Sequence, residues 1–364
     1  MGDFNGDGKL DLAICDFTSG NVIIFAGNGD GTFHLVGPFI SGLYPVAIAV
    51  ADLDHDGKLD LVVANTTSGT TTGHTVSVLM GNGDGSFRAA VPYVTGTSPY
   101  GVVVGDFNGD GKPDLAVANF GDNTVSILKG NGDGTFAAGV PYATGYFPDG
   151  LAIGDFNGDG KLDLAVVSDN ANVSILLGHG DGTFGVATNF TTGSGSASVA
   201  VADFNGDGRS DLAIVNRFDN NLVLLIGNGD GTFQAPQIHS VGASPSSVVA
   251  RDLNGDGKPD VVVNSHVNNN ISVLLQTGGA APATLGIQSG SPQTAAVGCA
   301  MPVAIRWPAY RSSLRRQRLV PRGRSAAREP SRRQQAMHRV SRPRRRSRRT
   351  RPRVRLASSR ASPL

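Results

Sequence analysis

A nine-residue acidic segment recurs six times along the chain. It reads DFNGDGKLD at 3–11, and close variants begin at Asp52, Asp106, Asp155, Asp203 and Asp252. Oxygen-bearing side chains occupy positions 1, 3, 5 and 9 of each segment, and glycine occupies position 6. Calcium prefers six to eight oxygen ligands, and glycine permits a sharp turn because it adopts a positive φ at little cost. The segments are therefore predicted to be calcium-binding loops.

Each predicted site combines four side chains with the backbone carbonyl of the residue at position 7, whose own side chain is expected to point out of the loop. The loop at Asp52 has a fourth carboxylate, Asp54, and is predicted to bind most tightly, whereas the loop at Asp3 is predicted to bind most weakly. The predicted metal ligands are Asp3, Asn5, Asp7, Lys9, Asp11, Asp52, Asp54, Asp56, Lys58, Asp60, Asp106, Asn108, Asp110, Lys112, Asp114, Asp155, Asn157, Asp159, Lys161, Asp163, Asp203, Asn205, Asp207, Arg209, Asp211, Asp252, Asn254, Asp256, Lys258 and Asp260.

Other interpretations of the acidic segment explain less of it. Its opening resembles the helix–loop–helix calcium motif, but it has aspartate at position 9, and Pro113 and Pro259 at position 8 disfavour a helix. The lack of paired histidines or cysteines argues against zinc. Magnesium remains an alternative, although it prefers a stricter octahedron. Simple turns would explain Asn, Asp and Gly, but not aspartate at positions 1, 5 and 9 of all six copies, where the carboxylates would repel one another.

The segments are spaced as a structural repeat. Their first aspartates are separated by 49, 54, 49, 48 and 49 residues, a period typical of propellers and solenoids. One repeat contains four short apolar runs, at 101–107, 115–120, 123–130 and 135–142, bounded by Gly, Asn and Asp. We expect an all-β fold, a β-propeller of about six four-stranded blades; a β-solenoid is the rival. The longer second repeat contains a polar insertion at 66–74, expected to be an exposed loop.

A second motif recurs with nearly the same spacing as the first. GNGDGTF or a close variant occurs at 27–33, 81–87, 130–136, 178–184 and 227–233. Asn-Gly and Asp-Gly pairs favour hairpin turns, so we predict a turn here, with an accessory metal site as the alternative. The phenylalanine that ends each copy is expected to pack between blades.

Together the two motifs resemble the FG-GAP/VCBS repeat family, whose blades occur in integrin α-subunit propellers and in bacterial secreted proteins. The resemblance covers residues 1–279. It implies a calcium-loaded propeller in which the metal loop joins the first two strands of each blade on one face. The family commonly has seven blades, so the ring either closes at six or is a fragment of a larger ring, and we favour the fragment.

The two ends of the chain differ sharply in charge. Residues 1–300 contain 10 Lys and Arg against 29 Asp and no Glu, a net charge of −19, whereas residues 301–364 contain 21 Arg and one Glu, a net charge of +20. We expect a propeller at 1–279, a linker or the start of a truncated Ig-like domain at 280–305, and a disordered Arg-rich tail at 306–364. The tail is interpreted as a frameshifted reading of a GC-rich gene; a genuine basic tail and a nucleic-acid binder are the alternatives. Few aromatic residues are available there for stacking on bases, which makes nucleic acid an unfavoured partner.

Regular repetition with no singular cluster of acids and bases predicts a binding protein and not an enzyme. We expect a monomeric, calcium-stabilised adhesion module, secreted or on the cell surface, that recognises a protein or glycan ligand. The alternatives are a polysaccharide lyase or hydrolase and a purely structural spacer. No glutamate precedes Glu329, and the histidines lie at different repeat positions, so no catalytic residue is predicted. No apolar run is long enough for membrane insertion, and any export signal is expected to precede the first residue.

Overall fold

Glycine-rich turns divide the repeats into short strands, and a computed structural model shows how these strands assemble. The structure describes residues 1–66, 74–276 and 285–286. The chain divides into two units, Met1–Val297 and Gly298–Leu364, and all described residues belong to the first. The predicted linker, the Arg-rich tail and most of the insertion at 66–74 lie outside the described residues.

Four kinds of strand alternate along the chain. The innermost strands are β4 (Pro45–Ala51), β8 (Pro99–Gly105), β12 (Pro148–Gly154), β16 (Ser196–Ala202) and β20 (Pro245–Arg251). The second strands are β1 (Leu12–Asp16), β5 (Asp60–Asn65), β9 (Asp114–Asn119), β13 (Asp163–Ser168), β17 (Asp211–Asn216) and β21 (Asp260–Ser265). The third strands are β2 (Asn21–Gly27), β6 (Thr75–Leu79), β10 (Thr124–Leu128), β14 (Asn172–Leu176), β18 (Asn221–Leu225) and β22 (Asn270–Gln276). The outer strands are β3 (Phe33–Ile40), β7 (Val91–Val94), β11 (Val140–Ala143), β15 (Thr188–Thr191), β19 (Gln237–Ser240) and β23 (Leu285–Gly286).

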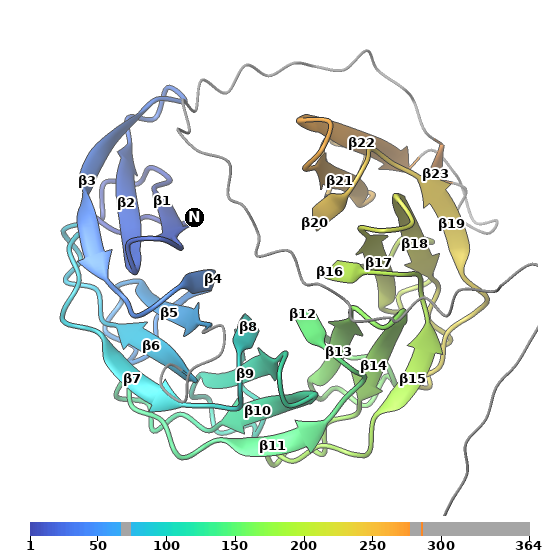
Figure 1. Ribbon diagram of the computed structural model, residues 1–364, viewed down its shortest axis with the longest axis horizontal. Helices are drawn as coiled ribbons and strands as arrows, with labels where there is room; N and C mark the ends of the chain where they lie inside the picture. Colours follow the sequence, from blue (N-terminus) through green and yellow to red (C-terminus); the bar gives the residue numbers. More distant parts are fainter. Residues whose placement is uncertain (67–73, 277–284, 287–364) are drawn as a thin grey trace, which may run out of the picture. The chain divides into compact units, whose positions relative to one another are not determined.

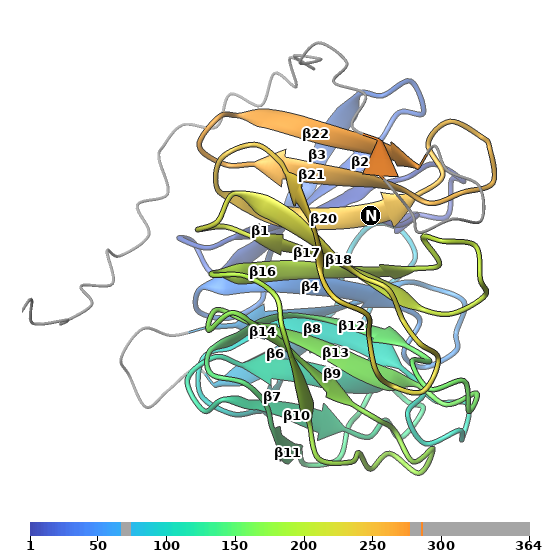
Figure 2. The same cartoon turned by 90° about the vertical axis from the view of Figure 1, so that its right-hand side faces the viewer.

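These strands form six small antiparallel sheets arranged as a six-bladed β-propeller (Figure 1). Blade one contains only β1–β2–β3, and blades two to six contain four strands each, paired in sequence order. The predicted all-β propeller is confirmed, and the described residues contain no helix. The edge-on view shows β20, β16 and β12 stacked across the ring (Figure 2). The turns at the two ends of the strands therefore form two opposite faces of the propeller.

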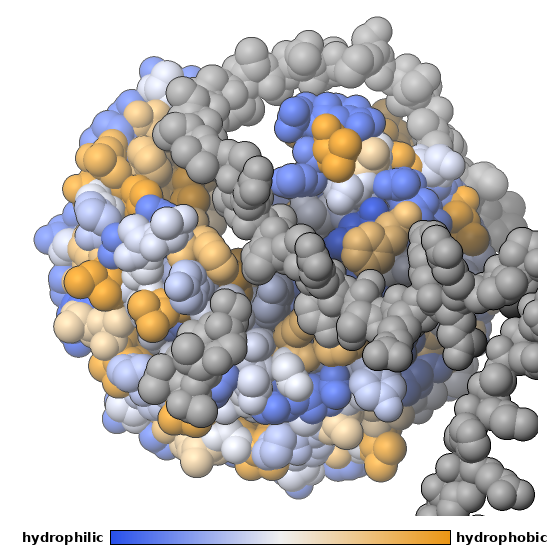
Figure 3. All heavy atoms as spheres, in the orientation of Figure 1, coloured by the Kyte–Doolittle hydropathy of each residue, from blue (hydrophilic) through white to orange (hydrophobic). Residues whose placement is uncertain are grey.

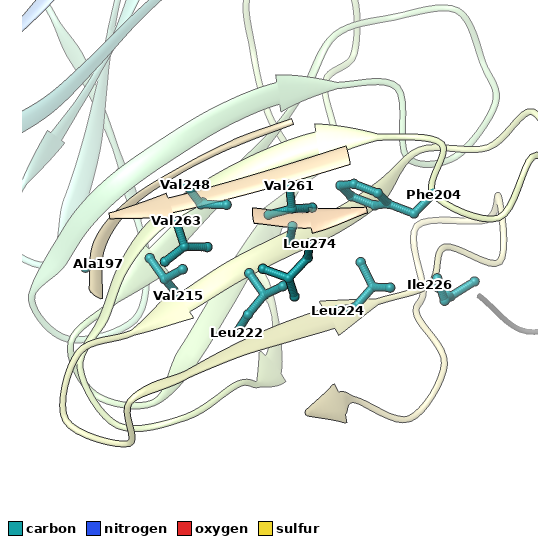
Figure 4. Close-up of a cluster of buried hydrophobic side chains, with 11 residues drawn as sticks. Ala197, Phe204, Val215, Leu222, Leu224, Ile226, Val248, Val261, Val263 and Leu274 are labelled. Atoms are coloured by element: carbon teal, nitrogen blue, oxygen red, sulfur yellow. The ribbon is translucent and has the colours of Figure 1, made fainter. Parts of the chain in front are cut away.

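Alternation of side chains along each strand builds the core between blades. All six residues of β5 are buried. Val62 and Ala64 pack in a cluster with blade three, whereas Leu61 and Val63 pack in a cluster with blade one. Successive side chains point to opposite faces of a strand, so each second strand is apolar on both faces. The same packing joins blades five and six, where residues of β17 and β18 meet β21 (Figure 4).

The phenylalanine of the second motif strengthens these contacts, as predicted. Phe184 of blade four is 7 % exposed and lies edge-on to two rings of blade three, with centroids 5.5 Å from Phe107 and 5.6 Å from Tyr142. Phe107 is position 2 of a metal loop, so this aromatic trio connects the two motifs across the blade boundary. Phe33 is an exception, because it is 42 % exposed in blade one, which follows no described blade.

The first and last blades each keep one apolar face that no other described blade covers. In blade six, Ile271 and Val273 are 49 % and 39 % exposed, whereas Leu222 and Leu224 at the same positions of blade five are fully buried. Apolar residues also gather over β3 of blade one in the space-filling view (Figure 3). The fragment of a seven-bladed ring remains a prediction.

Candidate metal centre

Each predicted metal loop connects an innermost strand to the second strand of the same blade. In the third loop, the carboxylate of Asp106 accepts backbone hydrogen bonds from Gly109 (2.8 Å), Asp110 (3.2 Å) and Gly111 (2.8 Å). Asn108 accepts from the Asp110 N–H at 2.9 Å. Gly109 and Gly111 have φ of +71° and +81°, which lets the backbone curl around the first aspartate. The side chains at positions 1 and 3 are therefore held inside the loop.

The aspartate at position 9 has a second role that the sequence analysis missed. Asp114 is fully buried, and its Oδ2 accepts a hydrogen bond from the N–H of Phe107 at 3.0 Å. Its Oδ1 accepts from the N–H of Gly130, the first residue of the second motif, at 2.7 Å. This carboxylate therefore ties the metal loop to the end of the third strand. The matching residues Asp11, Asp60, Asp163, Asp211 and Asp260 make the same pair of contacts in the other blades.

The second loop brings three carboxylates together. One oxygen each from Asp52, Asp54 and Asp60 lies within 4.8 Å of the others, and this is the one such group found among the described residues. The other five loops have asparagine at position 3, so they offer an amide oxygen in place of the second carboxylate. Asp54 therefore contributes to a carboxylate cluster. That this loop binds calcium most tightly stays a prediction.

The aspartate at position 5 is placed differently. In the second loop, the Oδ2 of Asp56 lies 2.9 Å from the Nζ of Lys58 at position 7. The same pairing spans 3.4 Å at Lys9, 3.9 Å at Lys112, 3.4 Å at Lys161 and 4.0 Å at Arg209. The side chains at position 7 thus turn toward position 5 of the same loop. They also cover the second motif, since a Cβ added to Gly132 would lie 3.0 Å from the Lys112 Cδ.

The electrostatics of position 9 fit a bound cation. Burial raises the pKa of Asp60, Asp114 and Asp163, and the nearby loop carboxylates raise it further. The pKa of Asp211 rises to about 6 for the same reasons. A divalent ion among these oxygens would offset both the repulsion and part of the desolvation. Carboxylate and amide oxygens without nitrogen or sulfur ligands suit a hard cation such as Ca²⁺.

The second motif forms the predicted turn. In blade one, the N–H of Asn28 donates to the carbonyl of Thr32 at 2.9 Å, and the exposed Asp30 accepts from the Thr32 N–H at 2.9 Å. In blade four, the N–H of Gly182 donates to the carbonyl of Phe107 in the metal loop of blade three at 2.9 Å. The N–H groups of Gly85 in blade two and Gly231 in blade five make the same contact with the metal loop of the preceding blade.

Sequence comparison with family models decides the affiliation. The FG-GAP-like repeat model matches residues 3–63, 65–117, 106–166, 155–214 and 203–263. The chain belongs to the FG-GAP-like repeat family. No curated protein sequence matches the chain.

Solved structures share the propeller fold of this FG-GAP-like chain at low sequence identity. A protein from Lactobacillus plantarum is 19 % identical with a TM-score of 0.58, and the match covers 77 % of this chain and 81 % of that one. The periplasmic gluconolactonase PpgL of Pseudomonas aeruginosa is 19 % identical with a TM-score of 0.55, covering 75 % and 78 %. BBS1N in its complex with ARL6DN is 14 % identical with a TM-score of 0.50, covering 75 % of each chain. At these identities the likeness shows the fold alone.

The structure corrects one premise of the sequence analysis, that nothing singular interrupts the repeats. Arg217 and Asp149 are 68 residues apart in sequence, and the Nη2 of Arg217 lies 2.5 Å from the Oδ2 of Asp149. Five further ion pairs each lie within a single metal loop. The two residues occupy different repeat positions, so periodicity could not have brought them together.

Proposed function

We propose that this propeller is a calcium-stabilised binding module that acts outside the cell or on its surface and recognises a protein or glycan. The recurrence of one oxygen-rich loop at the same place in six blades carries the proposal. Calcium at each loop would fix the end of an innermost strand to the start of the second strand. Extracellular calcium reaches millimolar concentrations, at which sites with dissociation constants of ~50 μM would each stabilise the fold by roughly 1.8 kcal/mol.

Residues of this chain would supply the ligands of that ion. The side chains at positions 1 and 3 already lie inside the loop. The buried aspartate at position 9 is held next to it by a hydrogen bond from the N–H at position 2. Position 5 would complete the set if its carboxylate turned away from the lysine or arginine at position 7. Metal binding would then act structurally, by making the propeller a rigid frame for a ligand site elsewhere.

The role as a binding module is tested by ligand capture with and without calcium. The full chain is immobilised and exposed to a glycan array and to extracellular matrix proteins, first with millimolar free calcium and then with chelator. Calcium-dependent capture of a defined glycan or protein is the expected result. Failure to bind any member of either set, by a protein that calcium stabilises, would refute the binding role and favour a spacer.

A second candidate function, an enzyme acting on polysaccharides, is favoured by one observation. Burial raises the pKa of Asp149 to about 6 and also raises the pKa of Asp169. Carboxyl groups with raised pKa are suited to general acid–base catalysis. Assays for release of reducing ends and of unsaturated products from a polysaccharide panel test this candidate. Turnover that Asp149→Asn abolishes would support it, whereas absence of turnover across the panel would contradict it.

A further inference from the structure

The face opposite the metal loops differs from blade to blade. In five blades, the residue that follows the second strand donates its N–H to the residue that precedes the innermost strand. The five donors are Thr66, Phe120, Asp169, Arg217 and His266, at distances of 2.9–3.1 Å. We call these five residues the variable ring. They share one backbone position but have five different side chains, whereas the metal loops repeat nearly the same residues. Side chains that vary on a constant frame are typical of ligand recognition.

Strand length separates the variable ring from the metal loops. Each innermost strand has seven residues, begins beside the variable ring and ends at a metal loop. At about 3.3 Å per residue, the two faces lie roughly 20 Å apart. A ligand at the variable ring would therefore touch no predicted calcium ligand.

A charged trio occupies this face in blades four and five. Arg217 pairs with Asp149, and their side chains are 28 % and 15 % exposed. Asp169 is connected to Arg217 through Gly195, whose N–H donates to the Asp169 carbonyl at 3.2 Å and whose carbonyl accepts from the Arg217 N–H at 2.9 Å. Burial raises the pKa of Asp169, and the nearby guanidinium of Arg217 offsets part of that rise. Among the described residues, neither the Oδ1 of Asp169 nor the Nε of Arg217 has a hydrogen-bond partner, although both atoms are buried. The trio thus holds one unsatisfied acceptor and one unsatisfied donor, which is costly in a buried place.

An aromatic stack lies beside the trio. The rings of Tyr100 and Phe120 are stacked, with centroids 5.0 Å apart and an interplanar angle of 29°. The ring of Phe147 continues the stack at 5.1 Å and 34°, and its side chain is 39 % exposed. Tyr100 and Asp149 both lie where the register of the innermost strand shifts, and such bulges redirect side chains. The stack and the trio are neighbours, because a Cβ added to Gly101, next to Tyr100 in sequence, would lie 2.6 Å from the Asp149 carbonyl oxygen. Burial raises the pKa of the Tyr100 phenol, and the nearby Asp149 carboxylate raises it further.

The two unsatisfied atoms discriminate between kinds of ligand. An ammonium or guanidinium group only donates hydrogen bonds, so it could satisfy Asp169 but not the Nε of Arg217. A phosphate or carboxylate only accepts, so it could satisfy Arg217 but not Asp169. A hydroxyl group both donates and accepts. Two neighbouring hydroxyls could donate to the Oδ1 of Asp169 and accept from the Nε–H of Arg217, once the outer torsions of these two side chains turn toward the ligand. The exposed ring of Phe147 offers a flat apolar surface at the same place.

We propose that Tyr100, Phe120, Phe147, Asp149, Asp169 and Arg217 form a carbohydrate-binding site for a pyranose with neighbouring hydroxyl groups. The sugar would lie with its apolar face on Phe147 and its hydroxyls toward Asp169 and Arg217. This proposal rests on the proposed binding function and commits to a glycan as the ligand. A peptide also donates and accepts through its backbone, so the test must distinguish the two. It also locates the ligand on the face away from calcium.

The test uses the full chain in calcium on an array of pyranose-containing oligosaccharides, followed by titration calorimetry with the best ligand. We expect binding of at least one oligosaccharide, with affinity lowered about tenfold or more by Asp169→Asn and by Phe147→Ala. Asp181→Asn, an exposed residue of the second motif on the metal-loop face, is the control and should bind normally. Thermal melting in calcium verifies that each variant is folded.

Three results would overturn the proposal and are distinguishable from one another. Oligosaccharide binding that both variants retain would place the glycan site elsewhere and leave the binding function intact. Calcium-dependent capture of a protein, without any oligosaccharide, would reject the glycan while the binding function stands. Failure to bind either class would remove both proposals.

Discussion

Replacing the buried aspartate at position 9 tests whether the acidic segment is a metal-binding loop or a simple turn. Asp163 is fully buried and accepts hydrogen bonds from the N–H of Phe156 at 2.9 Å and of Gly178 at 2.7 Å. In Asp163→Asn, one oxygen remains as an acceptor, but the other becomes an NH₂ group that faces a backbone donor. Hydrogen bonds to charged groups contribute about 1.5–3 kcal/mol, and an unsatisfied buried donor costs about 1–3 kcal/mol. We therefore expect a loss of about 3 kcal/mol of unfolding free energy when calcium is bound.

The same substitution should cost less when calcium is removed. Without a cation, the carboxylate of Asp163 is desolvated and lies near Asp155 and Asp159, which is why its pKa is raised. Asparagine relieves that repulsion and offsets part of the lost hydrogen bonding. Denaturant unfolding of wild type and variant, each in calcium and in chelator, measures the four free energies. An equal loss in both conditions would refute the reasoning, because it would make position 9 a turn residue alone. Asp181→Asn is the control: this residue is exposed and its side chain bonds only to Thr183 in its own turn, so its replacement should change stability little in either condition.

Three further predictions concern other parts of the molecule. Asp54→Asn should remove the tightest site, and calcium titration monitored by calorimetry should lose its highest-affinity step; retention of that step would place the tightest site elsewhere. Phe184→Ala should destabilise the fold by about 3–5 kcal/mol in denaturant unfolding, since it empties the aromatic contact between blades three and four; Phe33→Ala, at the exposed copy, should cost far less. Because burial raises the pKa of Asp149 to about 6, its contribution to stability is fully present below about pH 4 and is lost as pH rises through 6. The unfolding free energy of wild type minus that of Asp149→Asn, measured in calcium, should therefore fall by about 3 kcal/mol from pH 4 to pH 7; a flat difference would show that the carboxyl is not desolvated.

Much of the fold could be predicted because the repeat is local. Each blade contains its own turn glycines and alternating apolar strands, so residues 101–142 alone predict the four strands β8 to β11. The packing of Phe184 between blades also follows from its position after a turn. The three-stranded first blade follows from the acidic loop at Asp3, which no apolar strand precedes in the sequence.

Other features depend on contacts that repeat spacing does not encode. The link from Asp114 to Gly130 joins two motifs that the sequence presents as separate turns, and only the folded blade shows that one carboxylate serves both. The pairing of Arg217 with Asp149 crosses a blade boundary and uses two different repeat positions. A search for repeat positions whose residues vary most would have found Arg217 and Asp169, because they replace Thr66 and Phe120 in the aligned blades.

Counting bound calcium tests the central claim most directly. The full chain, freed of metal with chelator, is dialysed to equilibrium against buffers of increasing free calcium, and the bound ion is measured per chain. The six oxygen-rich loops predict a plateau at six calcium ions, together with a rise in thermal stability over the same concentration range. A chain that binds no calcium at millimolar free concentration would contradict the account, since the aspartates would then serve only as turn residues.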